Sequence, residues 1–275
     1  MKFRHQIPSL YHSLFPSELL QEDLKETKAN CANCSMTREN RGARARITYE
    51  RHLKCCTFEP VIPNYFVGAI LENESQFQDA AASIRERIRR REYALPIGLV
   101  PTVRFQVELN NRKKNEFGNR EDWLCPYYQK KTQNCGIWKF RGAVCTTFFC
   151  QSDAGASGET FWKGLGSYLN YVEMALLEEI LVLLDFSPRQ MSEMLGFINR
   201  HEASKAELDS DALSPATFRR IWNGYDSDIE GFYKLCYKKA LEFKRSGFEE
   251  MLGETGLKLE DKVLKQMRKR RERIP

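Results

Sequence analysis

The stretch Trp162–Asp185, WKGLGSYLNYVEMALLEEILVLLD, decides the fold class of this chain. Its apolar residues recur close to every 3.6 positions, a period typical of a helix that buries one face in a core. The most apolar part, Met174–Asp185, is about half as long as a membrane span and is interrupted by Glu178 and Glu179. The stretch therefore predicts a long core helix and not a membrane span.

The sequence around this stretch has the same helical character. A turn-rich segment, Ser152–Gly158, comes before it and predicts a boundary between residues 1–152 and residues 153–275. Residues 153–275 are therefore expected to form an α-helical region. Its helices are expected at about residues 160–186, 188–202, 215–246 and 258–272.

Residues 1–152 are less regular. Helical segments are expected within residues 1–30, from Asn64 onward, and at residues 76–93. Alternating apolar and polar residues in Val100–Leu109 predict the one strand. Between Cys31 and Asn64 few periodic apolar residues occur, which is typical of a loop organised by a bound ion. The expected fold is mostly α with little β: an irregular, metal-organised N-terminal half and a helical C-terminal half.

The composition bounds the class of protein. The chain has 275 residues, of which 42% are hydrophobic and 29% are charged, and its mean hydropathy is −0.55. These values exclude a membrane-embedded bundle and a disordered chain. The N-terminus lacks the apolar stretch of a secretory signal, so a cytoplasmic protein is expected. In a reducing cytosol, closely spaced cysteines bind metals or do redox chemistry more often than they form disulfides.

The formal net charge of +6 is unevenly distributed. Residues 1–150 contain 24 Lys/Arg and 16 Asp/Glu, a net +8, whereas residues 151–275 contain 19 and 21, a net −2. Metal-bound thiolates form negatively charged centres, so we interpret the basic surplus as compensation for such centres. The basic stretches Arg85–Arg91 and Lys262–Arg273 are interpreted as solvated helix faces, because no nucleic-acid-binding motif accompanies them. Nucleic acid is therefore not an expected partner.

Eight of the nine cysteines lie in the first 150 residues. They form two sets of four: Cys31, Cys34, Cys55 and Cys56, then Cys125, Cys135, Cys145 and Cys150. In Cys31-Ala-Asn-Cys34 the spacing lets both thiolates reach one cation from a tight turn, whereas the adjacent Cys55 and Cys56 point apart. One cysteine of that pair is therefore expected to serve each of two centres.

The cysteine ligands alone do not distinguish one kind of metal centre from another. Four thiolates are typical of a structural zinc site and of an iron–sulfur cluster alike. Buried free thiols are a further alternative for the set. Cys236 lies in a helical pattern and is predicted to be a core residue. His52, three residues before Cys55, is a possible ligand, but we favour the interpretation that it is an exposed or packing residue.

The order of these motifs resembles the YkgJ-type cysteine-cluster family of zinc- or iron-chelating proteins, and flagellin lysine N-methylases carry a similar cluster. The family's run C-P-(x)n-C-x-I-Y-x-x-R-P-x-x-C is matched with Trp138 for the Tyr and Gly142 for the Pro. The matching residues are Cys125, Pro126, Cys135, Ile137, Arg141 and Cys145. By this resemblance the implied ligands are Cys31, Cys34, Cys55, Cys56, Cys125, Cys135 and Cys145.

The resemblance covers roughly Cys31–Cys150, with two departures from the family. The family places its C-x-x-C and Cys-Cys a few residues apart, but twenty residues separate Cys34 from Cys55 here, and Cys150 is additional. The resemblance therefore implies metal binding more firmly than any reaction, and it leaves the helical C-terminal half unassigned.

We expect an iron–sulfur metalloprotein with a redox or cluster-dependent role, holding a [4Fe–4S] cluster and up to two centres, with a protein or electron-transfer partner. The alternative is a zinc-stabilised protein-interaction module without catalytic activity. All eight clustered cysteines, Cys150 included, are candidate ligands. No catalytic residue is assigned, because the glycines form no dinucleotide-binding motif and the helices contain no Glu-x-x-His motif.

Overall fold

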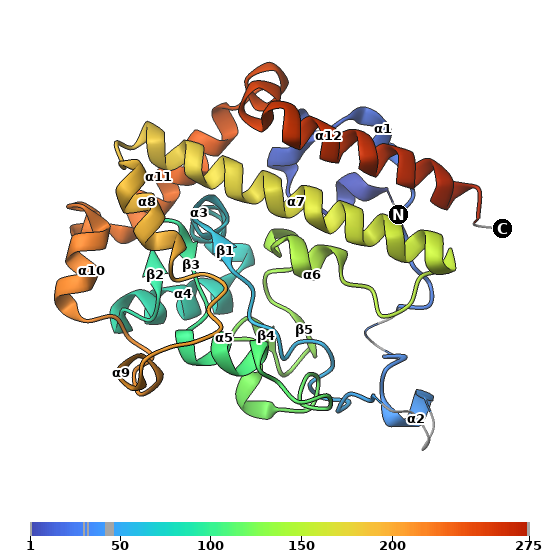
Figure 1. Ribbon diagram of the computed structural model, residues 1–275, viewed down its shortest axis with the longest axis horizontal. Helices are drawn as coiled ribbons and strands as arrows, with labels where there is room; N and C mark the ends of the chain where they lie inside the picture. Colours follow the sequence, from blue (N-terminus) through green and yellow to red (C-terminus); the bar gives the residue numbers. More distant parts are fainter. Residues whose placement is uncertain (1, 30, 32, 42–46, 274–275) are drawn as a thin grey trace.

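Helix α7 (Gly155–Leu183) runs across the middle of the molecule, and the other long helices pack around it (Figure 1). The computed structural model describes residues 2–29, 31, 33–41 and 47–273. Helices make up 58% of the structure and strands 5%, which confirms the expected mostly-α class with little β. Twelve buried residues of α7 bring it into contact with both halves of the chain. None of the described helices is long and apolar enough to cross a membrane.

Two helix pairs dominate the packing. Helix α12 (Arg245–Arg271) lies along α7, and α11 (Ile229–Glu242) packs closely on α3 (Asn64–Glu72). The second contact depends on Gly68, because a Cβ atom there would lie 1.9 Å from the carbonyl oxygen of Tyr233. Residues from both sides of the predicted boundary thus share one hydrophobic core, and the division into two domains stays a prediction.

The N-terminal residues pack beside the C-terminal helix. The segments η1 (Phe3–His5), η2 (Ser9–Ser13) and α1 (Ser17–Gln21) form the helical lead-in, and α1 contacts α12. Side chains of α12 form ion pairs with this lead-in and with the loop after it: Arg268 with Glu18, Arg271 with Glu22, and Arg270 with Glu26. Much of the basic C-terminal stretch is thus bound to acidic groups of the same chain.

Short strands connect the helices of the N-terminal half. Strands β1 (Ile62–Pro63), β2 (Ala94–Leu95) and β3 (Gly98–Leu99) form an antiparallel sheet in the order β1-β3-β2. Strands β4 (Tyr128–Gln129) and β5 (Asn134–Cys135) form a separate antiparallel pair in which Tyr128 lies opposite Cys135. This hairpin brings Cys135 into the lining of the candidate site.

The predicted strand at Val100–Leu109 is wrong, because most of it forms helix α5 (Val103–Asn110). Thr102 caps this helix by accepting a hydrogen bond from the backbone N–H of Phe105 at 3.2 Å. Alternation over so few residues also fits a short helix with buried positions three residues apart, and here Val103 and Gln106 are both buried. The N-terminal cap therefore decides the local structure.

The other predicted helices differ mainly in their ends. The expected helix 76–93 is α4 (Gln78–Arg90), and the expected helix 188–202 is the shorter α8 (Pro188–Leu195). The expected helix 215–246 is divided into α10 (Pro215–Trp222) and α11, because Asn223 and Gly224 adopt positive φ angles of 50° and 91°. The short helices α2 (Arg38–Arg41), α6 (Ala143–Thr147) and α9 (Lys205–Leu208) complete the fold.

Candidate functional site

Six of the eight clustered cysteines line one cavity of about 570 Å³, which we call the thiol cavity. They come from four separate segments: Cys31, the loop Cys55–Cys56, the segment of Cys125 and Cys135, and helix α6 with Cys145. Figure 1 shows α6 directly below α7 and the β4–β5 hairpin below α6, on the side of α7 away from α12. The structure therefore mixes the two sequence sets, with three cysteines from each.

Backbone hydrogen bonds hold these segments together. The N–H of Cys125 donates to the carbonyl of Cys56 at 2.8 Å, so the two cysteine segments are joined directly. Gly136 N–H donates to the carbonyl of Tyr127 at 2.8 Å and extends the β4–β5 hairpin. The cysteine backbones are thus fixed by local bonds as well as by the core.

Helix α6 is fixed by a buried carboxyl group of α7. The Glu173 side chain accepts a hydrogen bond from the N–H of Ala143 at 3.0 Å, at the first turn of α6. Glu173 is buried, and burial raises the pKa of its carboxyl group from 4.5 to about 8. Because Cys145 lies two residues after Ala143, Glu173 positions the segment that carries this thiol.

The lining of the thiol cavity is apolar and aromatic apart from the thiols and a few polar groups. Tyr49, Phe58, Phe117, Trp138 and Phe148 provide aromatic surface. Among its described lining residues there is no aspartate, glutamate or histidine. Every anionic ligand atom that these residues could offer to a metal is therefore a thiolate sulfur or the phenolate of a tyrosine.

Two cations face the thiols. Lys54 is 5% exposed, and its Nζ donates to the carbonyl of Gln133 at 3.3 Å. The Arg141 guanidinium stacks on Trp138, with 3.5 Å between Cζ and the ring centroid, and its Nε donates to the carbonyl of Trp138 at 3.0 Å. Neither cation forms an ion pair with any carboxylate in the described ranges. Both positive charges are therefore available to a negatively charged occupant.

The Arg141 guanidinium is held among the thiols against its preference for water. Burial lowers the pKa of Arg141, and the nearby thiols of Cys135, Cys145, Cys31 and Cys55 oppose that decrease, with Cys135 the strongest of the four. Arg141, one of the residues in the motif match, lines the thiol cavity together with these cysteines.

One buried polar atom of the cavity has no partner. The hydroxyl of Tyr128 is buried and makes no hydrogen bond with any residue of the described ranges. Burial raises the pKa of this phenol, and the Cys56 and Cys31 thiols raise it further. An unsatisfied hydroxyl of this kind lowers the stability of the fold by about 1–3 kcal/mol unless an occupant of the cavity accepts a hydrogen bond from it.

The thiols themselves are stabilised in the neutral form while no cation is bound. Burial raises the pKa of Cys125 well above 9 and that of Cys145 to about 12. For Cys55 the hydrogen bond with Cys56 raises the pKa most, and burial adds to it. Metal binding would reverse this preference, because a bound cation stabilises the thiolate.

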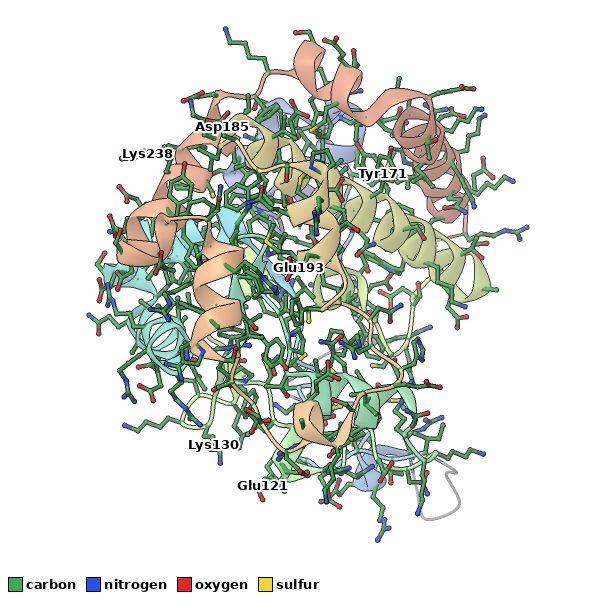
Figure 2. The ribbon with its side chains drawn as sticks, turned by 60° about the vertical axis from the view of Figure 1, so that its left-hand side comes forward. Glu121, Lys130, Tyr171, Asp185, Glu193 and Lys238 are labelled. Carbon is green, nitrogen blue, oxygen red and sulfur yellow. The ribbon has the colours of Figure 1, made fainter. Side chains whose placement is uncertain are left out.

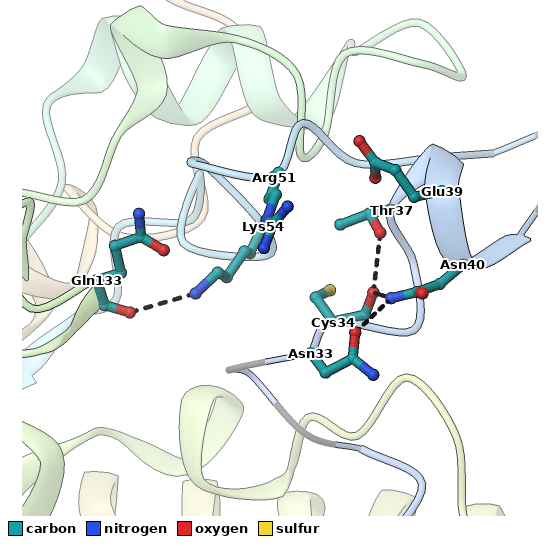
Figure 3. Close-up of a pocket in the computed structure, with 8 residues that line it drawn as sticks. All are labelled: Asn33, Cys34, Thr37, Glu39, Asn40, Arg51, Lys54 and Gln133. Atoms are coloured by element: carbon teal, nitrogen blue, oxygen red, sulfur yellow. Dashed lines mark hydrogen bonds between the residues drawn. The ribbon is translucent and has the colours of Figure 1, made fainter.

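Cys34 and Cys150 lie outside the thiol cavity. Cys34 lines a smaller polar cavity of about 80 Å³, which shares Lys54 and Gln133 with the larger one (Figure 3). Its carbonyl accepts hydrogen bonds from Thr37 Oγ1 at 3.1 Å and Asn40 Nδ2 at 2.8 Å. Cys150 lies close to Ser35, the residue that follows Cys34: Ser35 Oγ is 3.2 Å from the sulfur of Cys150.

The remaining candidates stand apart from these cavities. Cys236 is buried in α11, which confirms the predicted core position, and His52 is exposed. All nine cysteines are free thiols. In the described ranges, no group of three or more His, Cys, Asp or Glu side chains has an arrangement that could hold one metal ion. The six thiols thus surround a space and do not converge on a point.

Sequence reasoning missed two contributors to this site: Lys54 and Glu173. Lys54 stands directly before the Cys55–Cys56 pair. Glu173 was detectable as a carboxyl group on the apolar stripe of α7, four residues after Leu169 and four before Leu177.

No protein family, no curated protein and no solved structure was found to match this chain. The functional conclusion therefore depends on the site itself.

Proposed function

We propose that this protein is a cysteine-cluster metalloprotein that binds an iron–sulfur cluster in the thiol cavity and uses it in a redox or cluster-dependent role. The observation that carries the proposal is the gathering of six thiols around one cavity whose described lining contains three cations without an ion pair, Lys54, Arg112 and Arg141, and no carboxylate. Soft thiolate ligands select iron–sulfur clusters, zinc and copper(I) over hard cations such as Mg²⁺.

The size of the cavity favours a cluster over a single ion. A zinc ion draws its four thiolate sulfurs to about 2.3 Å and leaves no free space between them. Each cysteine of a [4Fe–4S] cluster binds a different iron atom, so its ligand sulfurs surround the cluster without converging on a point. Six thiols around about 570 Å³ fit the second arrangement. When bound, the cluster would supply one-electron redox chemistry or a Lewis-acidic iron.

The residues around the thiols also suit a negatively charged centre. Lys54 and Arg141 would offset the charge of four thiolates, and the unpartnered Tyr128 hydroxyl could donate a hydrogen bond to a sulfur. Hydrogen bonds and charges of this kind set the reduction potential of such centres. The aromatic lining excludes water and adds to this control.

The proposal extends to the compartment and the second centre. Free thiols and a cluster both require a reducing environment, so we place the protein in the cytoplasm. The order of the cysteine motifs in Cys31–Cys150, which resembles that of YkgJ-type proteins, favours metal binding in this region. Cys34 and Cys150 would be two of the ligands of a second metal centre beside the smaller cavity.

Anaerobic purification followed by iron, acid-labile sulfide and zinc analysis tests the proposal. We expect a brown protein with iron and sulfide in equal amounts, about four of each per chain for one [4Fe–4S] cluster. Eight of each would indicate two centres. A colourless protein with stoichiometric zinc and no sulfide would contradict the proposal and favour a zinc-stabilised interaction module.

Single Cys→Ser variants locate the ligands. Cys125→Ser and Cys145→Ser should lose most of their iron, because both thiols line the cavity. Cys236→Ser is the matched control, since this buried thiol lies in α11, outside the site, and it should keep its iron. Full iron content in variants of all six lining cysteines would show that the cavity is not the cluster site.

A further inference from the structure

The thiol cavity opens on a surface with exposed apolar side chains. Trp138, Val144 and Phe148 all line the cavity, yet they are 49%, 49% and 43% exposed. A residue that lines a cavity and is about half exposed stands at its mouth. These three large side chains therefore form an apolar patch at the mouth, where a folded partner could bury them.

Several cations lie at the cavity lining or next to it in the chain, and we call them the basic rim. Each member lines the cavity or stands within two residues of a lining residue, and each is exposed. The members are Arg112, Lys113, Lys114, Lys131 and Lys139. Within the described part of the chain, none of them forms an ion pair with a carboxylate.

Most acidic residues of the same region are already engaged. Glu116 accepts a hydrogen bond from the N–H of Lys113 at 2.6 Å, Asp122 is paired with Arg120, and Glu121 is paired with Lys130 at 3.6 Å. Figure 2 shows Glu121 and Lys130 at one end of the molecule, far from Lys238. Glu50, next to the lining residue Tyr49, is exposed and forms no ion pair in the described ranges, so the free charges around the mouth are predominantly, but not all, positive.

We infer that the mouth of the thiol cavity is a docking surface for a small acidic protein. An apolar centre with a polar rim is the usual anatomy of a protein interface, and the free charges of this rim are predominantly positive. The basic rim would speed the encounter with an acidic surface and fix its orientation, and burial of Trp138, Val144 and Phe148 would supply affinity.

A protein fits this surface better than a nucleic acid does. Single-stranded nucleic acids bind by stacking bases on open aromatic faces. One face of Trp138 is already covered by the guanidinium of Arg141, at 3.5 Å from its centroid. Val144 adds an aliphatic side chain, which a protein surface can bury but a base cannot stack on in the same way.

The acidic partner would be an electron carrier, and this part of the inference rests on the proposed function. The docking itself does not depend on the proposed function. Binding and cluster content are therefore measured separately on the same samples. Loss of docking with full iron and sulfide would refute this inference alone. Docking without iron or sulfide would refute the proposed function alone.

The test measures binding of the full-length protein to an acidic probe, oxidised plant-type [2Fe–2S] ferredoxin, at 50 mM and 300 mM salt. We expect saturable binding that weakens at least about fivefold at the higher salt. The variant Lys113→Glu/Lys114→Glu/Lys131→Glu/Lys139→Glu should weaken it at least about tenfold. Val144→Ser should weaken it by about threefold, because it removes apolar contact area at the centre.

A control variant separates docking at the mouth from general attraction. Lys25→Glu/Lys238→Glu/Lys262→Glu/Lys269→Glu changes the net charge by the same amount at exposed lysines outside the basic rim. It should retain most of the affinity. Equal losses in the two variants, absence of binding, or tighter binding of a single-stranded oligonucleotide at the basic rim would each overturn the inference. Circular dichroism and thermal melting show whether the variants are folded.

Discussion

Glu173 is a carboxyl group buried on the core side of α7, where it accepts the N–H of Ala143. Burial raises its pKa to about 8, while the unfolded chain keeps the ordinary value of 4.5. Between these values the folded state binds the proton more tightly, so the free energy of unfolding decreases as the pH rises from about 4.5 to about 8. We expect this loss to be on the order of 3 kcal/mol between pH 5 and pH 8.

Glu173→Gln removes this titration and keeps a side-chain oxygen for Ala143. The variant and the parent should melt at similar temperatures at pH 5, and the variant should melt at the higher temperature at pH 8. Melting curves at several pH values, on samples with equal metal content, check this. A difference in melting temperature that does not change with pH would mean that Glu173 is ionised throughout.

Arg141 is the second residue whose role depends on charge. If its guanidinium offsets the charge of a cluster, Arg141→Gln should make the cluster harder to reduce and lower its midpoint potential by on the order of tens of millivolts. Arg141→Lys keeps the charge and should restore most of the potential. Spectroelectrochemical titration measures the three proteins, and equal potentials in all of them would show that Arg141 serves only to pack against Trp138.

At the scale of elements, α12 and the N-terminal lead-in are joined by a buried ion pair. Arg270 Nη2 donates to Glu26 Oε1 at 3.0 Å, and both side chains are 0% exposed. Glu26 also accepts hydrogen bonds from Ser152 Oγ at 3.0 Å and from Trp162 Nε1 at 2.6 Å. This one carboxylate therefore connects the N-terminus, α7 and α12.

Arg270→Met leaves that carboxylate buried without its cation and should lower the free energy of unfolding by about 3–5 kcal/mol. Arg268→Met is the matched control on the same helix, because its pair with Glu18 is largely exposed and is worth about 0–1 kcal/mol. Denaturant unfolding of both variants gives the comparison. Equal losses would indicate that the Arg270 pair is no more important than a surface one.

At the scale of the whole molecule, the core and the cysteine segments are stabilised in different ways. Helices α3, α7 and α11 bury long runs of apolar residues, whereas residues 47–58 bury only Tyr49 and Leu53 as large apolar groups. Segments with few buried apolar contacts open most easily. A bound metal would therefore contribute much of the stability of the cysteine segments.

Removal of metal should accordingly affect the two parts differently. In hydrogen exchange, residues 47–58 and 124–150 should lose protection after chelation by about tenfold or more, while α7 and α11 should keep theirs. The helices serve as the internal control. Unchanged protection in the cysteine segments of the metal-free protein would show that they are held by the protein alone.

Much of the fold was predictable from local sequence patterns, and the errors have local causes. The apolar stripe of α7 is long enough to define a helix without its neighbours, and the helical start at Asn64 is confirmed as α3. The alternation in Val100–Leu109 was too short to separate strand from helix, and the cap at Thr102 decided in favour of α5. The break at Asn223–Gly224 was readable from the dipeptide itself.

The candidate site was predictable as a set of cysteines but not as an arrangement. Spacing along the chain separates Cys31–Cys56 from Cys125–Cys150, because sequence order contains no information about which loops meet. The hydrogen bond between Cys125 and Cys56 and the β4–β5 hairpin bring three thiols of each set to one cavity. Cys34 and Cys150 are left beside it.

The sequence by itself determined the helical class, the long core helix and the gathering of thiols and positive charge in the first half, because periodicity and composition are local properties. Only the tertiary structure decided that six thiols surround one space, that Lys54 and Arg141 face it unpaired, and that Glu173 fixes α6. These features depend on contacts between residues far apart in the chain. Such contacts are set by packing on α7. The same packing buries Glu173, and this burial raises the pKa of its carboxyl group.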